Sequence, residues 1–336
     1  CEAALQTATP PVDGYPPFDV HRDLREAIAE RYAADHGVAI DPEREVAVLP
    51  GTKTGIMLAC LAAAERGDAV ALPDPGYPDY LSGAALAGAR VLPLPLDAGA
   101  GFQPDLGALG EDPALLVLNY PSNPTSACER PGTLEAAVAR AQARGGWVLH
   151  DLAYGFLAFD GRRARSVLEA DGARDVALEL WSPSKVCGMA GWRVGFAVGA
   201  PELVARVQLL LDHGAAGVWT GIQRGLAAAL RGPQDDVAER REVYRRRRDV
   251  LVGALTAAGA PPAPAEGSFY VWWRLPEGLT AERILAEARV GVAPGEGFGA
   301  RGRGWARLSL ALPEADLEEA AVRLQDLVSR YLPVHG

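Results

Sequence analysis

The chain has 336 residues, 49% of them hydrophobic, and a formal net charge of −10 at neutral pH. This length is enough to bury a substantial core and predicts two unequal domains. The acidic balance argues against a nucleic-acid partner and the absence of an apolar run near the roughly 20 residues that span a bilayer argues against a membrane partner, so we expect a cytoplasmic protein.

Short apolar runs alternate with amphipathic stretches of helical length from Val46 onward, which indicates a mostly parallel sheet covered by helices. The predicted strands of this sheet lie at residues 69–72, 115–119, 147–151, 176–181 and 194–198. Ahead of them, residues 23–36 place Leu24, Ile28 and Tyr32 on one face and predict a helix.

A smaller α+β domain is predicted after residue 235. Its elements are a long charged helix at 235–255, strands near 269–273 and 305–310, and a final helix from 313. We therefore expect an α/β fold in which residues 40–235 form the larger domain and residues 1–39 and 236–336 form the smaller one.

The four cysteines are scattered and show neither a CxxC pair nor the spacing of a zinc site with the five histidines. We therefore expect free thiols in a reducing compartment and no metal site. Cys187 lies two residues after Lys185, and we expect it to pack in the interior because no histidine lies near it in sequence to act as a base.

Ser182-Pro183-Ser184-Lys185 follows a predicted strand, and Arg193 comes eight residues after the lysine. A lysine at the end of an apolar strand, in a glycine-bearing loop with hydroxyls and an arginine, suits a Schiff base to an aldehyde cofactor that carries a phosphate. Ser182 and Arg193 would bind the phosphate. A surface loop with a solvated lysine is the alternative interpretation of this segment.

Asp151 ends the predicted strand 147–151, at the sheet edge where open α/β sheets bind ligands. A carboxylate buried there needs a cationic partner, and a pyridinium nitrogen kept protonated by Asp151 would be one. Tyr154 would then hydrogen-bond the phenolic oxygen of the same ring. A helix N-cap is the simpler interpretation of Asp151, and His150 should point to the opposite face as a structural residue.

Three further segments lead to the same sheet edge. Asn123 lies in a proline-rich turn after residues 115–118 and would donate to a phenolic oxygen. Thr52 and Lys53 precede an apolar helix at 56–64, whose N-terminus can hold a phosphate. Tyr77, in a Pro-Gly turn, would stack on a planar cofactor. Ordinary turns and an ordinary helix start remain the alternatives.

Arg307 lies in the predicted strand 305–310. A buried arginine needs an anion, and a substrate α-carboxylate would bind it through two hydrogen bonds.

Taken in order, these segments resemble class I/II aminotransferases of pyridoxal 5'-phosphate (PLP) fold type I. Their motif sequences are most similar to those of the branch that contains LL-diaminopimelate aminotransferase. The resemblance implies that Lys185 forms the Schiff base and moves protons, while Asp151 pairs with the pyridine nitrogen. It implies that the remaining contacts to cofactor and substrate come from Thr52, Lys53, Tyr77, Asn123, Tyr154, Ser182, Arg193 and Arg307. Ser126 departs from the pattern, since the family usually has glycine there.

The activity implied is ping-pong transfer of an amino group between an amino acid and a 2-oxo acid or related carbonyl. The resemblance also implies a homodimer with shared active sites, in which Tyr15 reaches the phosphate bound by the neighbouring subunit. β-Elimination, decarboxylation or cyclisation of an amino acid on the same scaffold is an alternative function. A non-catalytic PLP-binding regulator is another, although no helix-turn-helix module is apparent in the sequence.

Overall fold

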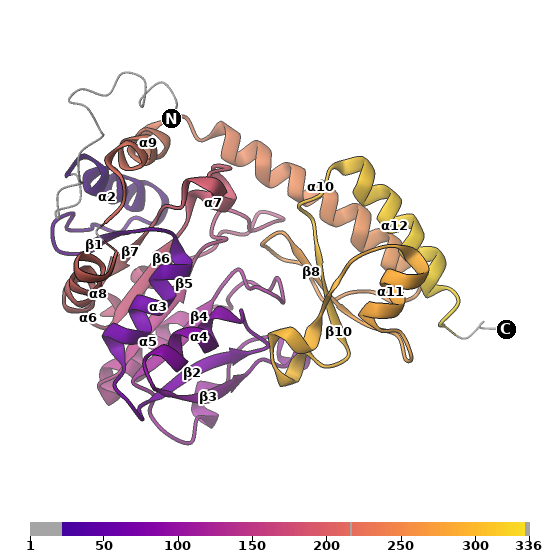
Figure 1. Ribbon diagram of the computed structural model, residues 1–336, viewed down its shortest axis with the longest axis horizontal. Helices are drawn as coiled ribbons and strands as arrows, with labels where there is room; N and C mark the ends of the chain where they lie inside the picture. Colours follow the sequence, from indigo (N-terminus) through magenta and orange to yellow (C-terminus); the bar gives the residue numbers. More distant parts are fainter. Residues whose placement is uncertain (1–21, 216, 333–336) are drawn as a thin grey trace.

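Residues 22–215 and 217–332 are described by a computed structural model, and within them the strands form a seven-stranded and a three-stranded sheet (Figure 1). The larger sheet has the order β1-β7-β6-β5-β4-β2-β3. Its strands are β1 (Val46–Leu49), β2 (Ala69–Asp74), β3 (Arg90–Pro95), β4 (Leu115–Asn119), β5 (Trp147–Asp151), β6 (Ala177–Trp181) and β7 (Gly195–Gly199). The five strands predicted for this sheet are present with ends shifted by at most two residues, and β1 and β3 join them.

Strands β3, β2, β4, β5 and β6 pair in parallel, whereas β7 pairs antiparallel with both β6 and β1. Helices cover both faces, and the covering explains why the central strands are continuous apolar runs. The helices that accompany this sheet are α2 (Arg22–His36), α3 (Thr52–Ala63), α4 (Asp79–Leu86), α5 (Thr133–Arg144), α6 (Ala173–Val176), α7 (Pro183–Val186), α8 (Pro201–Gly214) and α9 (Thr220–Arg231).

Two apolar cores lie on opposite faces of the larger sheet. Helices α3, α4 and α8 pack on one face, and α2, α5 and α9 pack on the other. Helix α2 thus belongs with the larger sheet, although the sequence pattern placed residues 1–39 with the smaller domain. The buried side chains of Leu24, Ile28 and Tyr32 meet Val46, Val48 and other residues of this sheet.

The smaller α+β part contains α10 (Asp235–Ala257), β8 (Tyr270–Arg274), α11 (Ala281–Ala288), β9 (Ala293–Pro294), β10 (Trp305–Ser309) and α12 (Glu314–Val328). Strand β10 pairs antiparallel with β8 and β9, and the three helices pack on this sheet around a third apolar core. In Figure 1, α10 runs from the larger part to the smaller one. None of the helices in the described residues is long and apolar enough to be a membrane span.

Short 3₁₀ turns complete the chain. They are η1 (Ala98–Ala100), η2 (Leu106–Ala108), η3 (Val167–Glu169), η4 (Ala190–Trp192), η5 (Gly295–Phe298) and η6 (Ala300–Gly302). Turn η3 carries a capping box, in which Ser166 and Glu169 satisfy each other's backbone N–H groups.

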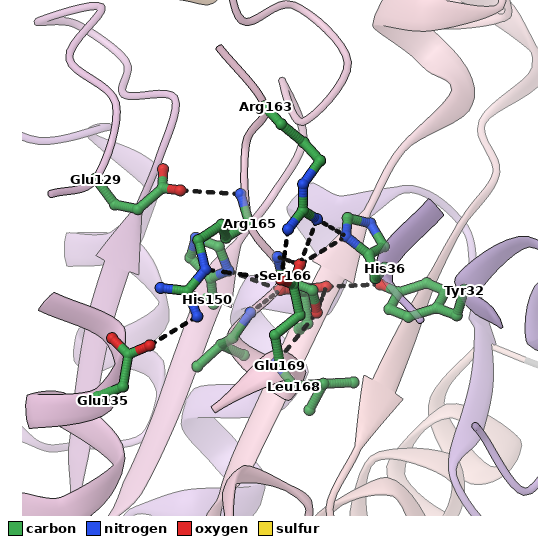
Figure 2. Close-up of polar contacts among 12 residues, drawn as sticks. Tyr32, His36, Glu129, Glu135, His150, Arg163, Arg165, Ser166, Leu168 and Glu169 are labelled. Carbon is green, nitrogen blue, oxygen red and sulfur yellow. Dashed lines mark hydrogen bonds and ion pairs between the residues drawn. The ribbon is translucent and has the colours of Figure 1, made fainter. Parts of the chain in front are cut away.

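A buried hydrogen-bond network surrounds the carboxylate of Glu179 in β6, which is fully buried. Its Oε1 accepts hydrogen bonds from the hydroxyls of Tyr32 (2.8 Å) and Ser166 (2.7 Å). Its Oε2 pairs with His150 Nδ1 at 2.7 Å and accepts from the Val167 N–H at 2.8 Å. Figure 2 shows how Tyr32, His150 and Ser166 converge from separate elements.

Glu179 and His150 each stabilise the charged form of the other. Burial alone would raise the pKa of the Glu179 carboxyl, but the hydrogen bonds of His150 and Ser166 and the charges of His150 and His36 together lower it. Burial alone would lower the pKa of His150, but Glu179, with smaller contributions from Glu129 and Asp151, raises it. The Glu179 carboxylate is surrounded by four donors, one of which is its ion-pair partner His150, and these contacts link β5, β6, α2 and η3. His150 is thus a structural residue, as its position in the strand predicted.

Removing this charge should destabilise the fold. We expect Glu179→Gln to lower the free energy of unfolding by about 3–5 kcal/mol, since it leaves buried donors facing an amide that cannot accept from all of them. Denaturant unfolding measures the loss.

The matched control is Glu202→Gln in α8. Glu202 is 64% exposed and pairs with Arg206, so its loss should change the unfolding free energy by less than about 1 kcal/mol. Equal losses in the two variants would contradict a special role for Glu179.

Candidate active site

A cavity of about 330 Å³ lies where β4, β5 and β6 end and α3 and α7 begin. Of the residues predicted for the site, it is lined by Thr52, Lys53, Tyr77, Asn123, Asp151, Tyr154, Ser182, Lys185 and Arg193. Gly51, Ile56, Asn119, Ala153, Ser184 and Tyr270 complete the wall. Tyr15 lies outside the described residues.

The strands bring these side chains together because their carboxyl ends meet at one edge. Asn119 and Asp151 are partners in the parallel register of β4 and β5. The Asn119 amide donates to the Asp151 carbonyl at 2.8 Å, and its Oδ1 accepts from the Asn123 N–H at 2.7 Å. Asn119 therefore fixes the turn that presents Asn123, a role that sequence patterns did not reveal.

Asp151 is 5% exposed. Its Oδ2 accepts a hydrogen bond from the Tyr80 hydroxyl at 2.8 Å, and its Oδ1 accepts from the Ala153 N–H at 3.1 Å. Burial raises the pKa of Asp151, and these hydrogen bonds offset it only in part. None of the ion pairs among residues 22–215 and 217–332 includes this carboxylate, so its location in the cavity wall suits a cationic ring nitrogen.

Lys185 lies in the single turn of α7, which Ser182 caps by accepting a hydrogen bond from the Ser184 N–H at 3.2 Å. The Lys185 ammonium lies 5.5 Å from the centroid of the Phe269 ring. Burial lowers the pKa of Lys185, and the positive charge of Arg193 lowers it further. A larger fraction of neutral amine makes this lysine a better nucleophile.

The N-terminus of α3 faces the same cavity, beginning one residue after Gly51, whose φ of 93° is in the region that favours glycine. A Cβ at Gly51 would lie 2.7 Å from Arg193 Nη2, which shows that the guanidinium covers this helix end. Free N–H groups beside an arginine make an anion site. Lys53 contributes less directly, because its ammonium pairs with Asp79 at 3.0 Å and is 63% exposed.

Two aromatic hydroxyl groups also belong to the wall. The Tyr77 ring packs edge-on against Tyr80 with 5.6 Å between ring centroids. The Tyr154 hydroxyl donates to the Tyr270 hydroxyl at 3.5 Å, and burial raises the pKa of Tyr154 well above its usual value. Tyr80 and Tyr270 were not predicted, since an aromatic residue in a buried helix or strand gives no signal that separates packing from function.

Arg307 does not line the cavity itself but reaches its wall from β10. Its Nη1 donates to Asn123 Oδ1 at 2.7 Å. Its Nε is buried and has no hydrogen-bond partner among the described residues. The edge formed by Nε and Nη2 is the one with which an arginine binds a carboxylate through two hydrogen bonds.

Comparisons with known proteins identify the family of the chain. The family model for aminotransferase class I and II matches residues 1–324. LL-diaminopimelate aminotransferase of Desulforudis audaxviator is 42% identical over 317 residues, which are 91% of this chain and 80% of the relative. L-Glutamine–4-(methylsulfanyl)-2-oxobutanoate aminotransferase of Bacillus subtilis is 39% identical over 97% of this chain and 84% of its own length. Substrate-bound BacF of Bacillus subtilis has a TM-score of 0.93 at 36% identity, covering 97% of this chain and 86% of that one.

The uncompensated charge of Asp151 should be measurable in the ligand-free protein. Because its pKa is raised in the folded state, the native protein loses stability relative to the unfolded chain as pH rises through the range above the ordinary value of 3.8. We expect Asp151→Asn to raise the thermal midpoint near pH 8 by about 1–2 °C per kcal/mol regained, since the Tyr80 hydroxyl can turn to accept from the new amide.

Asp160→Asn is the control for this prediction. Arg248 holds the pKa of Asp160 below its usual value, so this variant should gain no stability at the same pH. A midpoint for Asp151→Asn at or below that of the wild type would contradict the prediction.

Proposed function

Because the chain belongs to the class I and II aminotransferase family and thus transfers amino groups with PLP as cofactor, we propose that the cavity at the edge of the larger sheet is its active site. The observation that carries this proposal is that one cavity wall contains both a buried carboxylate and an amine. Asp151 is a buried carboxylate without an ion-pair partner among the described residues, and Lys185 is an amine with a lowered pKa.

In this proposal Lys185 holds the cofactor covalently and Asp151 keeps its ring nitrogen protonated. The bound cofactor supplies an electron sink for the bond electrons released at the substrate Cα. After the substrate amine has replaced Lys185 on the cofactor, the freed Lys185 amine would take up the Cα proton and deliver it to the carbon that receives the amino group. A carboxylate is needed at position 151 because a neutral amide would not hold the ring proton.

The other residues of the cavity bind and orient the cofactor. We assign the phosphate to the N-terminus of α3 at Thr52, together with Lys53, Ser182 and Arg193. Asn123 and Tyr154 donate to the phenolic oxygen. The Asn123 carbonyl oxygen already accepts from Arg307, which can only donate, so the Asn123 amide nitrogen is the end left for the cofactor. Tyr77 stacks on the ring.

Arg307 binds the α-carboxylate that amino donors and 2-oxo acid acceptors share. The support is its buried Nε, which lacks a hydrogen-bond partner among the described residues. We divide the chain near residue 235, between the part that holds the cofactor and the part that supplies Arg307.

A spectroscopic half-reaction tests transamination at Lys185. An amino donor such as glutamate should convert the protein-bound cofactor stoichiometrically to its amino form, and a 2-oxo acid should restore the starting spectrum. Borohydride reduction before adding the donor should fix the cofactor on the peptide that contains Lys185. Label on another lysine would refute the assignment, and release of ammonia or carbon dioxide without the amino form would indicate a different PLP reaction.

We further propose a cytoplasmic homodimer whose active sites contain residues of both subunits. Cys60, Cys128 and Cys187 are free thiols, which suits a reducing compartment. The dimer follows the family resemblance, in which a tyrosine at the position of Tyr15 reaches the phosphate of the neighbouring subunit.

Mixing two inactive variants tests shared sites. In a heterodimer of Lys185→Ala and Tyr15→Asp, one site carries both lesions and the other is intact. With random pairing, half the dimers are mixed and have one good site each, so activity should recover to about a quarter of wild type. If subunit exchange is verified and activity stays at the level of the parents, Tyr15 does not act across the dimer.

A further inference from the structure

Arg307 contacts two aromatic rings. Its guanidinium carbon is 4.0 Å from the centroid of the Tyr270 ring and 4.6 Å from that of Phe298. Tyr270 and Arg307 come from neighbouring strands, β8 and β10, in which Arg307 pairs with Trp272. Stacking on an aromatic face restricts the tilt of a guanidinium plane without using its N–H groups, so Tyr270 orients Arg307 without taking up the hydrogen-bond donors of its Nε–Nη2 edge.

The opposite end of Tyr270 meets the residue assigned to the cofactor oxygen. Tyr270 is 9% exposed, and its hydroxyl lies 3.5 Å from the hydroxyl of Tyr154. Hydroxyl hydrogens rotate to suit their surroundings. When Tyr154 donates to a cofactor oxygen, the Tyr270 hydroxyl can donate to Tyr154 and strengthen that donor.

The backbone of Tyr270 is fixed by Ser126. This residue has a φ of 61°, a conformation that favours glycine. Its hydroxyl donates to the Tyr270 carbonyl at 2.6 Å and lies 3.1 Å from the Ser268 hydroxyl. Both serines are fully buried. The serine side chain thus adds a bond between the Asn123 turn and β8 that glycine could not make.

These contacts close a ring of four parts. The turn that carries Asn123 also carries Ser126, Ser126 bonds to Tyr270, the Tyr270 ring contacts Arg307, and Arg307 bonds back to Asn123. A closed ring restricts each member more than separate contacts do, because moving one requires breaking two. Its members come from the loop that follows β4, from β8 and from β10.

We propose that Tyr270 is a positioning residue that sets Arg307 for the α-carboxylate of the amino acid and supports Tyr154 at the cofactor. The inference rests on the proposed roles of Arg307 and Tyr154. It assigns two separable tasks to one side chain: the ring face acts on substrate binding, and the hydroxyl acts on the cofactor's electronic state.

Two substitutions separate these tasks. Tyr270→Phe keeps the ring and removes the hydroxyl, so KM for the amino donor should stay near wild type. The pH midpoint of the lysine-bound cofactor's absorbance should rise by a few tenths of a unit, because Tyr154 becomes a weaker donor to the phenolate. Tyr270→Leu removes the ring face, so KM should also rise by about 5- to 30-fold with kcat much less affected.

Three controls make the result specific. Tyr32→Leu removes another buried tyrosine, bonded to Glu179 rather than to the site, and should lower thermal stability without moving KM or the absorbance midpoint. Ser126→Gly removes the serine hydroxyl and should raise KM less than Tyr270→Leu does. Arg307→Ala should raise KM more than any of these variants while the cofactor stays bound.

The variants at positions 270 and 307 distinguish failure of the inference from failure of the proposed function. If Arg307→Ala leaves KM unchanged, the carboxylate binds elsewhere, and the proposed role of Arg307 falls together with the inference, while transamination at Lys185 is tested separately by the half-reaction. If Arg307→Ala raises KM but Tyr270→Leu does not, Tyr270 does not position Arg307 and only the inference falls. An unchanged absorbance midpoint in Tyr270→Phe would remove the link to Tyr154.

Discussion

An ionised carboxylate at the end of a buried strand costs several kcal/mol unless a cation or hydrogen bonds compensate it, and Asp151 meets this requirement only in part within its own chain. The Tyr80 hydroxyl and the Ala153 N–H supply two hydrogen bonds. Burial nevertheless leaves the pKa of Asp151 raised. Under the proposed function, the protonated ring nitrogen of the cofactor would supply the missing charge, and its binding would recover the energy that the burial of Asp151 costs.

Strand β5 carries a stabilising residue on one face and a residue of the candidate active site on the other. Side chains alternate along β5, so His150 and Asp151 point to opposite faces of the sheet. On one face, His150 and Glu179 form an ion pair that is enclosed by hydrogen bonds and away from the cavity. On the other, Asp151 lacks an ion pair within the described chain and lies in the cavity wall. The paired charges hold β5 and β6 together, and this rigidity keeps the unpaired charge in place.

The sequence predicted most accurately the strands that are buried on both faces. Strands β4 and β5 were located to the residue because both their faces are covered and their runs are continuously apolar. Strand β3 escaped notice because it is an exposed edge with prolines at 93 and 95, where an edge strand tolerates them. The apolar face of α2 predicted a helix but not which sheet it meets, since a helical pattern records that a face is buried and not against what.

The same reasoning explains which parts of the site sequence patterns could indicate. Residues at strand ends were predictable because parallel strands end at one edge, which brings Asn123, Asp151 and Lys185 together. Tyr270 was not, because its importance arises from contacts with Ser126, Tyr154 and Arg307, which come from three other segments. Two polar groups of this site therefore lack a full complement of partners and have opposite sign: the Asp151 carboxylate on the larger sheet and the Arg307 Nε on the smaller one. Under the proposed function, a cationic ring would compensate the first and a substrate carboxylate the second. Cofactor and amino acid would then each supply a charge that the chain itself lacks, and binding both would join the two sheets electrostatically.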